Sequence, residues 1–229
     1  MKVGLSADNK EAGGYDPVTE ADRSAERALR RRIEEAFPDH GIWGEEYGAA
    51  RAGSAVQWSL DPVDGTRALV CGLPSWAVLA GLIVEGEHVA GMIDLPALDD
   101  CLIAVDGLTQ RNGMAVRTSG CERLSESRLA TTDPYLFADP APFDRVRKAA
   151  RLTRYGLDAL GYARVGTGDL DLVIESGLKR HDYDALVAVV RGAGGVIGNW
   201  WGGGDLSEGA VVAAASHGLY EEAVRLLAE

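Results

Sequence analysis

The chain has 229 residues, enough for one large domain or for two lobes that share a core. Hydrophobic residues make up 46% of it and charged residues 25%, which is typical of a globular protein and excludes a disordered or fibrous chain. The formal net charge is −12, and such an acidic surface repels nucleic-acid phosphates, so nucleic acid is a poor candidate partner. A soluble surface explains this surplus of carboxylates better than a cation site does, when composition is the only evidence.

Cysteine usage and hydropathy set the expected compartment. Cys71, Cys101 and Cys121 form no Cys-x-x-Cys pair and leave one residue over, so we expect reduced thiols in a cytoplasmic protein. The four histidines show no ligand spacing with them, which argues against a structural zinc site. The chain lacks a long apolar run and an apolar signal core, so we expect no contact with a membrane.

The N-terminal region predicts an irregular or extended entry followed by a helix. Residues 1–16 are polar and glycine-rich, and Thr19 is a predicted N-cap with Asp22 in the capping-box position. The helix starts near Glu20 and ends before Gly41. Its predicted apolar stripe, with charges on the opposite face, consists of Ala21, Ala25, Ala28, Leu29, Ile33 and Ala36.

The rest of the chain predicts a mixed α/β protein. Residues 41–48 predict a short strand that runs into a loop. Further predicted strands cover 56–60, 76–85, 88–94, 101–105, 129–132, 154–155, 170–175, 195–199 and 210–215, and predicted helices cover 142–152, 157–166, 182–192 and 217–227. A helical turn is expected after Thr66, and a loop is expected around Asn112-Gly113. Because strands and helices alternate from about Leu129, we divide the chain into an N-terminal lobe, 1–125, and a C-terminal lobe, 126–229.

The stretch Asp61-Pro62-Val63-Asp64-Gly65-Thr66 brings two carboxylates, three residues apart, into a tight turn at the end of a strand. Pro62 fixes its own φ, and Gly65 permits a sharp bend close to a ligand. Both carboxylates and the Val63 carbonyl can then face one cation, and hard oxygen ligands favour magnesium over zinc. Thr66 can open a helix whose free N–H groups suit a phosphate. Taken alone, such a stretch is only a turn about as often as it is a cation site.

Two other acidic sites accompany this turn. Gly44-Glu45-Glu46 follows a separate predicted strand, where adjacent glutamates are unfavourable unless one meets a cation or both face water. Asp182 lies between an apolar strand and an apolar helix, where it can be a ligand or only a helix cap.

Four motifs together resemble the inositol monophosphatase family of lithium-sensitive, magnesium-dependent phosphatases. In this sequence they are Asp16-Pro17-Val18-Thr19-Glu20-Ala21-Asp22, Gly44-Glu45-Glu46, Asp61-Pro62-Val63-Asp64-Gly65-Thr66, and His181-Asp182-Tyr183-Asp184-Ala185-Leu186 leading to Gly192–Gly195. The resemblance covers nearly the whole chain. It implies an α/β sugar-phosphatase fold of alternating helix and sheet layers, αβαβα, with the active site between the lobes. It also implies a homodimer, and it suggests that the family's first helix is missing here.

The resemblance implies two or three Mg²⁺ ions per site, with Mn²⁺ able to substitute. The first metal's implied ligands are Glu45, Asp61, the Val63 carbonyl and Asp64; the second metal's are Asp61, Asp64 and Asp182. Asp22, with Glu45 and through waters, serves a third, weaker ion. The implied catalytic residues are Glu45, Asp61, Asp64 and Thr66, with Glu45 and Thr66 deprotonating the attacking water. The implied substrate contacts are Asp64, Gly65, Thr66, Asp158, Glu175, Asp182 and Arg154.

Within the family, three stretches look most like the histidinol-phosphate phosphatase branch: Thr131–Phe137, Arg154–Asp158 and Asp171–Lys179. This resemblance implies hydrolysis of L-histidinol phosphate to L-histidinol and phosphate in histidine biosynthesis. Asp158 and Glu175 would suit the cationic amine of that ester, and Arg154 would touch the substrate or hold Asp158.

Departures from the branch leave other substrates open. Leu157 and His181 replace its more usual residues near the substrate, and His181 can contact substrate or pack in the core. Arg67 can touch the phosphate or the substrate, but a position at the surface is favoured. Alternatives are inositol monophosphate, fructose 1,6-bisphosphate and 3′-phosphoadenosine 5′-phosphate. An alternative of another class is an inactive protein that binds metal and phosphate, disabled by its short N-terminus.

Overall fold

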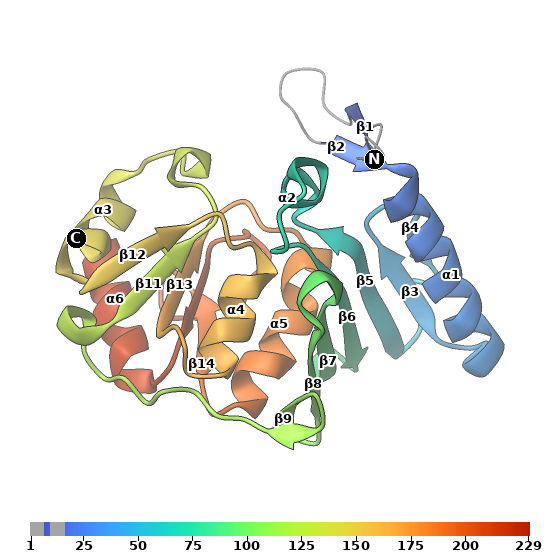
Figure 1. The fold of residues 1–229 in the computed structure, drawn as a ribbon. Coiled ribbons are helices and arrows are strands. Elements are labelled where there is room, and N and C mark those ends of the chain that lie inside the picture. The colour runs from blue at the N-terminus through green and yellow to red at the C-terminus, as the bar shows by residue number, and fades with distance from the viewer. Residues whose placement is uncertain (1–6, 10–16) are drawn as a thin grey trace.

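The computed structural model describes residues 7–9 and 17–229 (Figure 1). The predicted entry over 1–16, and Asp16 of the first motif, therefore lie largely outside the described residues. Strands β1 (Ala7–Asn9) and β2 (Pro17–Thr19) form an antiparallel pair, and the two larger sheets follow along the chain.

The first large sheet has eight strands in the order β10-β9-β8-β7-β6-β5-β3-β4. Their bounds are β3 (Gly41–Gly44), β4 (Gly48–Ala50), β5 (Val56–Asp64), β6 (Ala77–Val84), β7 (Glu87–Leu95), β8 (Asp100–Val105), β9 (Leu108–Arg111) and β10 (Met114–Ala115). The second has five strands in the order β12-β11-β13-β15-β14, namely β11 (Arg128–Thr131), β12 (Leu152–Tyr155), β13 (Leu172–Glu175), β14 (Val196–Asn199) and β15 (Val211–Ala214).

Helices form three further layers. The helices are α1 (Glu20–Ala36), α2 (Thr66–Cys71), α3 (Ala141–Ala149), α4 (Ala159–Gly166), α5 (Arg180–Gly192) and α6 (His217–Ala228), with 3₁₀ turns at Pro96–Leu98, Leu124–Glu126 and Pro134–Leu136. Helix α1 packs on β5 outside the first sheet, α4 and α5 lie between the sheets, and α3 and α6 cover the far face of the second (Figure 1). This confirms the predicted αβαβα layering.

The main core lies between the two sheets. It joins alternate residues of β6, β7 and β8 to α4, α5, β13 and β15. Helix α5 is buried along nearly its whole length because it has a sheet on either side, which explains its strongly apolar sequence. Since α5 comes from the C-terminal half and packs on strands of the N-terminal half, the division into lobes at residue 125 stays a prediction.

Two glycines let α5 approach the first sheet. A Cβ at Gly91 would lie 2.2 Å from the Ala185 carbonyl oxygen, and one at Gly81 would lie 2.9 Å from the Asp184 carbonyl carbon. We expect Gly91→Ala to lower the free energy of unfolding by about 1–3 kcal/mol, because α5 must move away from β7. Urea denaturation checks this. Gly53→Ala, where no atom lies within 4 Å of the added carbon, should change it by less than about 0.5 kcal/mol.

Three details differ from the sequence predictions. The short strand predicted to run into a loop over 41–48 is β3, but a turn follows it and leads into a second strand, β4, that was not predicted. The loop expected around Asn112-Gly113 is a hairpin between β9 and β10, since both residues adopt the positive φ that a two-residue hairpin turn requires. The apolar stripe of α1 is partly wrong: Ala21 and Ala28 are exposed, while Asp22 and Glu26 are buried.

Across 7–9 and 17–229, no helix has both the length and the apolar character needed to cross a membrane. The three cysteines are unpaired, as expected.

Candidate active site

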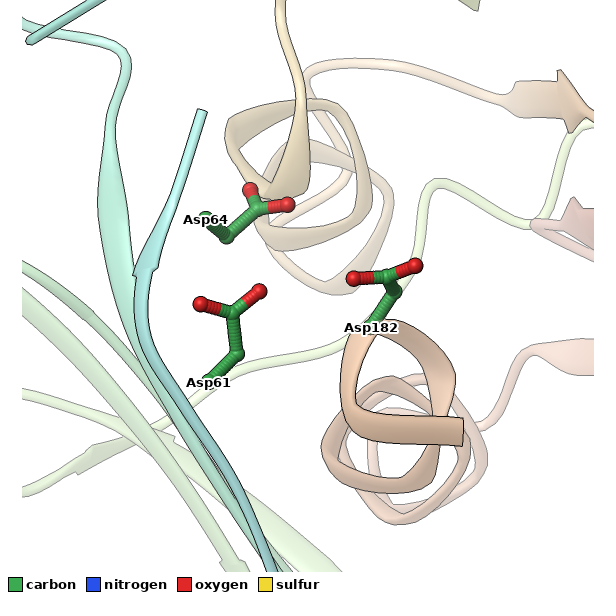
Figure 2. A group of neighbouring side chains, drawn as sticks. All are labelled: Asp61, Asp64 and Asp182. Atoms are coloured by element: carbon green, nitrogen blue, oxygen red, sulfur yellow. The ribbon is translucent and has the colours of Figure 1, made fainter. Parts of the chain in front are cut away.

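Three aspartates meet where β5 ends and α5 begins. Asp61 and Asp64 come from β5, and Asp182 comes from the first turn of α5. Each offers one carboxylate oxygen, and these three oxygens lie within 4.8 Å of one another. Figure 2 shows the carboxylates pointing toward a common space. Residues up to 121 positions apart in the sequence thus form one acidic cluster.

The turn after β5 has the local structure that its sequence predicts. The pairing with β6 shifts by one residue between Asp61 and Asp64, at Pro62, which has no N–H to give to the ladder. The Val63 N–H donates to Asp61 Oδ1 at 2.9 Å, and Gly65 takes a φ of 77°. These contacts turn the chain so that both aspartates face the same side.

Glu45 reaches the cluster because β3 runs parallel to β5. In this pairing Gly44 lies opposite Leu60, and the Glu45 N–H donates to the Leu60 carbonyl at 3.1 Å. Glu45 comes directly after Gly44 and Asp61 directly after Leu60, so the two residues lie next to each other, and both line one cavity.

Asp182 acts as a cap and also faces the cluster. Its Oδ2 accepts the Lys179 N–H at 2.6 Å, which closes the start of α5. Its Oδ1 lies 3.5 Å from His181 Nε2. The two interpretations of Asp182 left open by the sequence are therefore compatible.

Burial and mutual repulsion act on the aspartates together. Burial raises the pKa of Asp61 well above its usual range, and the charges of Glu45, Asp64 and Asp182 raise it further. Burial, then the charges of Asp158 and Asp182, raise the pKa of Asp64 in the same way. Carboxylates packed like this are stable as anions only beside a cation. Their oxygens are the donors that a hard divalent ion prefers, so the residues fit such an ion.

A cavity of about 240 Å³ opens beside the cluster, and it contains a second acidic pair. Glu175 accepts the Thr132 N–H at 2.7 Å and the Thr131 hydroxyl at 3.2 Å, and burial raises its pKa to about 7. Burial raises the pKa of Asp158 to about 6, against the lowering effect of Arg67. Asp158 has a φ of 49° and a ψ of −141°, a strained conformation of the kind found at functional sites.

Most residues singled out from the sequence line this cavity. They are Glu45, Asp61, Val63, Asp64, Gly65, Thr66, Asp158, Glu175, His181 and Asp182. Asp22 does not line it. Asp22 is fully buried and accepts hydrogen bonds from the Thr19 N–H (2.9 Å) and hydroxyl, and its Oδ1 lies 3.4 Å from Thr66 Oγ1. Its role toward a third ion stays a prediction.

The two arginines singled out near the site lie in different places. Arg154 is exposed on the edge strand β12 and does not line the cavity, so its position gives no support to the predicted substrate contact. Among the described residues no ion pair joins it to Asp158. Arg67 is exposed, as favoured from the sequence, and it also lines the cavity, as the alternative of a phosphate or substrate contact requires.

Sequence reasoning assigned no role to several other cavity residues. Tyr162 and Lys179 line the cavity, and Trp200 holds the strand beneath it by donating its indole N–H to the Glu175 carbonyl at 3.0 Å. The signal for Tyr162 was its place four residues after Asp158 at the start of a helix, which puts both on one helical face.

The model of the inositol monophosphatase family matches residues 2–229. The chain belongs to this family. It is 39% identical over 225 residues to the chloroplastic bifunctional phosphatase IMPL2 of Arabidopsis thaliana, a match that covers 92% of this chain and 65% of that relative. It is 33% identical over 207 residues to a histidinol-phosphatase of Chlorobaculum parvum, covering 89% of this chain and 80% of the relative. An inositol monophosphatase from Zymomonas mobilis has a similar solved structure, with a TM-score of 0.89, 37% identity, and coverage of 100% of this chain and 90% of that one.

Membership in the inositol monophosphatase family makes this chain a phosphatase, a phosphoric monoester hydrolase. The family is metal-dependent, and the cluster of Asp61, Asp64 and Asp182 offers the oxygen donors for a metal. Asp158 and Glu175 line the same cavity as that cluster.

Proposed function

We propose that this chain is a cytoplasmic, magnesium-dependent phosphatase that hydrolyses L-histidinol phosphate to L-histidinol and phosphate. The observation that carries the proposal is the second acidic pair. Asp158 and Glu175 are separate from the Asp61, Asp64 and Asp182 cluster, yet they line the same cavity. A cationic amine beside the phosphate would neutralise them in charge-assisted hydrogen bonds. The relative of Chlorobaculum parvum named histidinol-phosphatase supports the same substrate.

Asp61, Asp64, Asp182, Glu45 and the Val63 carbonyl would hold two Mg²⁺ ions, with Mn²⁺ as a substitute. When bound, such ions lower the pKa of water and neutralise charge on the phosphoryl group and the leaving oxygen.

The protein groups position the reactants. The Thr66 hydroxyl lies 3.0 Å from the Val63 carbonyl and 3.4 Å from Asp22, which fixes it at the cavity wall. Glu45 and Thr66 together would orient the attacking water, and Glu45 would take its proton. The N–H groups of Gly65 and Thr66 would hold phosphate oxygens at the start of α2.

Phosphate release from a panel of esters tests the proposal. With Mg²⁺ present, we expect kcat/KM for L-histidinol phosphate to exceed that for inositol 1-phosphate at least tenfold, because inositol phosphate brings no cation to the acid pair. EDTA should abolish release from both esters. A higher kcat/KM for inositol 1-phosphate would overturn the choice of substrate, and no release from any ester would favour the inactive binding protein.

A bisphosphorylated substrate is a second candidate. Arg67 and Lys179 line the cavity and could hold a second phosphate of fructose 1,6-bisphosphate or 3′-phosphoadenosine 5′-phosphate. Under this alternative Lys179→Met lowers kcat/KM for the bisphosphate far more than for L-histidinol phosphate. The homodimer is proposed from the family resemblance, and light scattering of the purified chain tests it.

A further inference from the structure

Glu26 is a buried carboxylate with no place in the proposed chemistry. It lies on α1, one turn after Asp22, and is fully buried. Burying a charge is unfavourable unless it is paired and hydrogen-bonded, so its partners show what it does. They all belong to α1 itself or to the turn that carries Glu45.

The Glu26 carboxylate holds this turn by its backbone. It accepts the Glu46 N–H at 2.7 Å and the Tyr47 N–H at 3.3 Å. Arg30 Nε donates to the same carboxylate at 2.7 Å, and Arg30 also donates to the Gly48 carbonyl. The Glu26–Arg30 pair therefore holds the turn between β3 and β4 through the N–H groups of Glu46 and Tyr47 and through the carbonyl of Gly48.

The fit is close at Gly44. A Cβ there would lie 2.0 Å from Glu26 Oε1 and 2.8 Å from an Arg30 guanidinium nitrogen. Position 44 of the Gly44-Glu45-Glu46 motif must therefore be glycine, because any side chain there would collide with the Glu26 carboxylate. On the other side, the Glu45 N–H is fixed by Leu60 of β5.

We propose that Glu26, paired with Arg30, is a positioning residue that fixes the Glu45 side chain for metal binding. The inference rests on the proposed function, in which Glu45 is a metal ligand. Glu26 does not line the cavity, and its carboxylate binds the backbone of Glu46 and Tyr47, so its effect passes through the backbone of residues 45–47. Residues that orient a ligand typically change metal affinity or activity 10- to 100-fold when they are altered.

The test is a double-mutant cycle on the full chain, read by calorimetric titration with Mg²⁺. We expect Glu26→Gln to weaken Mg²⁺ binding about 10- to 100-fold when Glu45 is present, and by less than about threefold in a Glu45→Gln background. At saturating Mg²⁺, kcat should fall while KM for the ester changes little, because the acid pair lies on the other side of the cavity. Glu34→Gln, a partly exposed glutamate of the same helix, is the matched control and should leave Mg²⁺ binding unchanged.

Each result decides the proposal. The positioning role of Glu26 is overturned if Glu26→Gln leaves Mg²⁺ binding unchanged. It is also overturned if Glu26→Gln weakens Mg²⁺ binding equally with and without Glu45. If Glu45→Gln alone leaves Mg²⁺ binding unchanged, Glu45 is not a metal ligand. That result counts against the proposed function and is obtained without any change at Glu26. If Glu26→Gln does not fold, Gly44→Ala takes its place in the cycle, because the added carbon disturbs the same carboxylate.

Discussion

Asp64→Asn should reduce kcat at least 100-fold while the fold stays intact. The substitution removes a negative charge from the cluster, and the loss of a direct metal ligand costs several kcal/mol of transition-state stabilisation. The fold persists because an asparagine oxygen can still accept the Ala159 N–H, which now lies 2.7 Å from Asp64 Oδ2. Phosphate release with saturating Mg²⁺ and the far-ultraviolet circular dichroism spectrum measure the two effects.

A second readout separates the charge from the chemistry. Because burial, then the charges of Asp158 and Asp182, raise the pKa of Asp64, its carboxylate destabilises the metal-free protein near pH 8. Asp64→Asn should therefore raise the thermal midpoint in EDTA and abolish most of the rise that Mg²⁺ causes in the wild type. Asp205→Asn, the same change at an exposed loop, should do neither. An activity loss below about 100-fold would contradict the metal role.

The acidic cluster could be predicted because its members sit in short motifs with strong local constraints. Asp61-Pro62-Val63-Asp64-Gly65 specifies a strand end, a bulge and a left-handed residue, and the structure has all three. That turn meets Glu45 and Asp182 because β3 pairs in parallel with β5 and because α5 packs between the two sheets. Neither contact follows from local sequence, so the convergence rested on the family resemblance.

Helix α1 shows where periodicity alone fails. The hydrophobic pattern placed every charge on the solvent side, yet Asp22 and Glu26 are buried while Ala28 is exposed. Their burial is offset by hydrogen bonds to Thr19, Thr66 and the turn after β3, contacts that lie up to 44 residues away along the chain. A helical pattern cannot reveal distant partners, so a buried functional carboxylate looks like a surface residue.

One residue predicted to contact substrate, Arg154, lies away from the cavity for a related reason. Arg154 was chosen from a motif shared with one branch, but its strand lies at the sheet edge and its side chain is exposed. Arg67 has an ordinary sequence context, and only the αL turn at Gly65 brings it to the cavity. Asp158 and Glu175 were identified from the family resemblance, in the stretches Arg154–Asp158 and Asp171–Lys179.

Glu175→Gln should lower kcat/KM for L-histidinol phosphate about 10- to 100-fold. The carboxylate is buried and held by Thr131 and Thr132, so it is fixed in place to bind an ammonium group, and a hydrogen bond to a charged group is worth about 1.5–3 kcal/mol. An ester without an ammonium group, such as p-nitrophenyl phosphate, should lose far less. Glu208→Gln, at an exposed position, is the matched control. Equal losses on both esters would contradict recognition of an amine by Glu175.

The same carboxylate has a second consequence, for stability against pH. Burial raises its pKa in the folded protein from 4.5 to about 7, so between these values the folded state keeps a proton that the unfolded state has lost. Stability rises with pH only where the unfolded state binds more protons; here it binds fewer, so the free energy of unfolding falls as pH rises from about 4.5 to 7, by roughly 3 kcal/mol from this group. Glu175→Gln should make that part of the profile less steep in metal-free protein, as urea denaturation at a series of pH values would show; the remaining slope comes from the other buried carboxylates, Asp61, Asp64 and Asp158. A bound ammonium group favours the ionised carboxylate, so L-histidinol should restore stability most at the upper end of this range, and only when Glu175 is present.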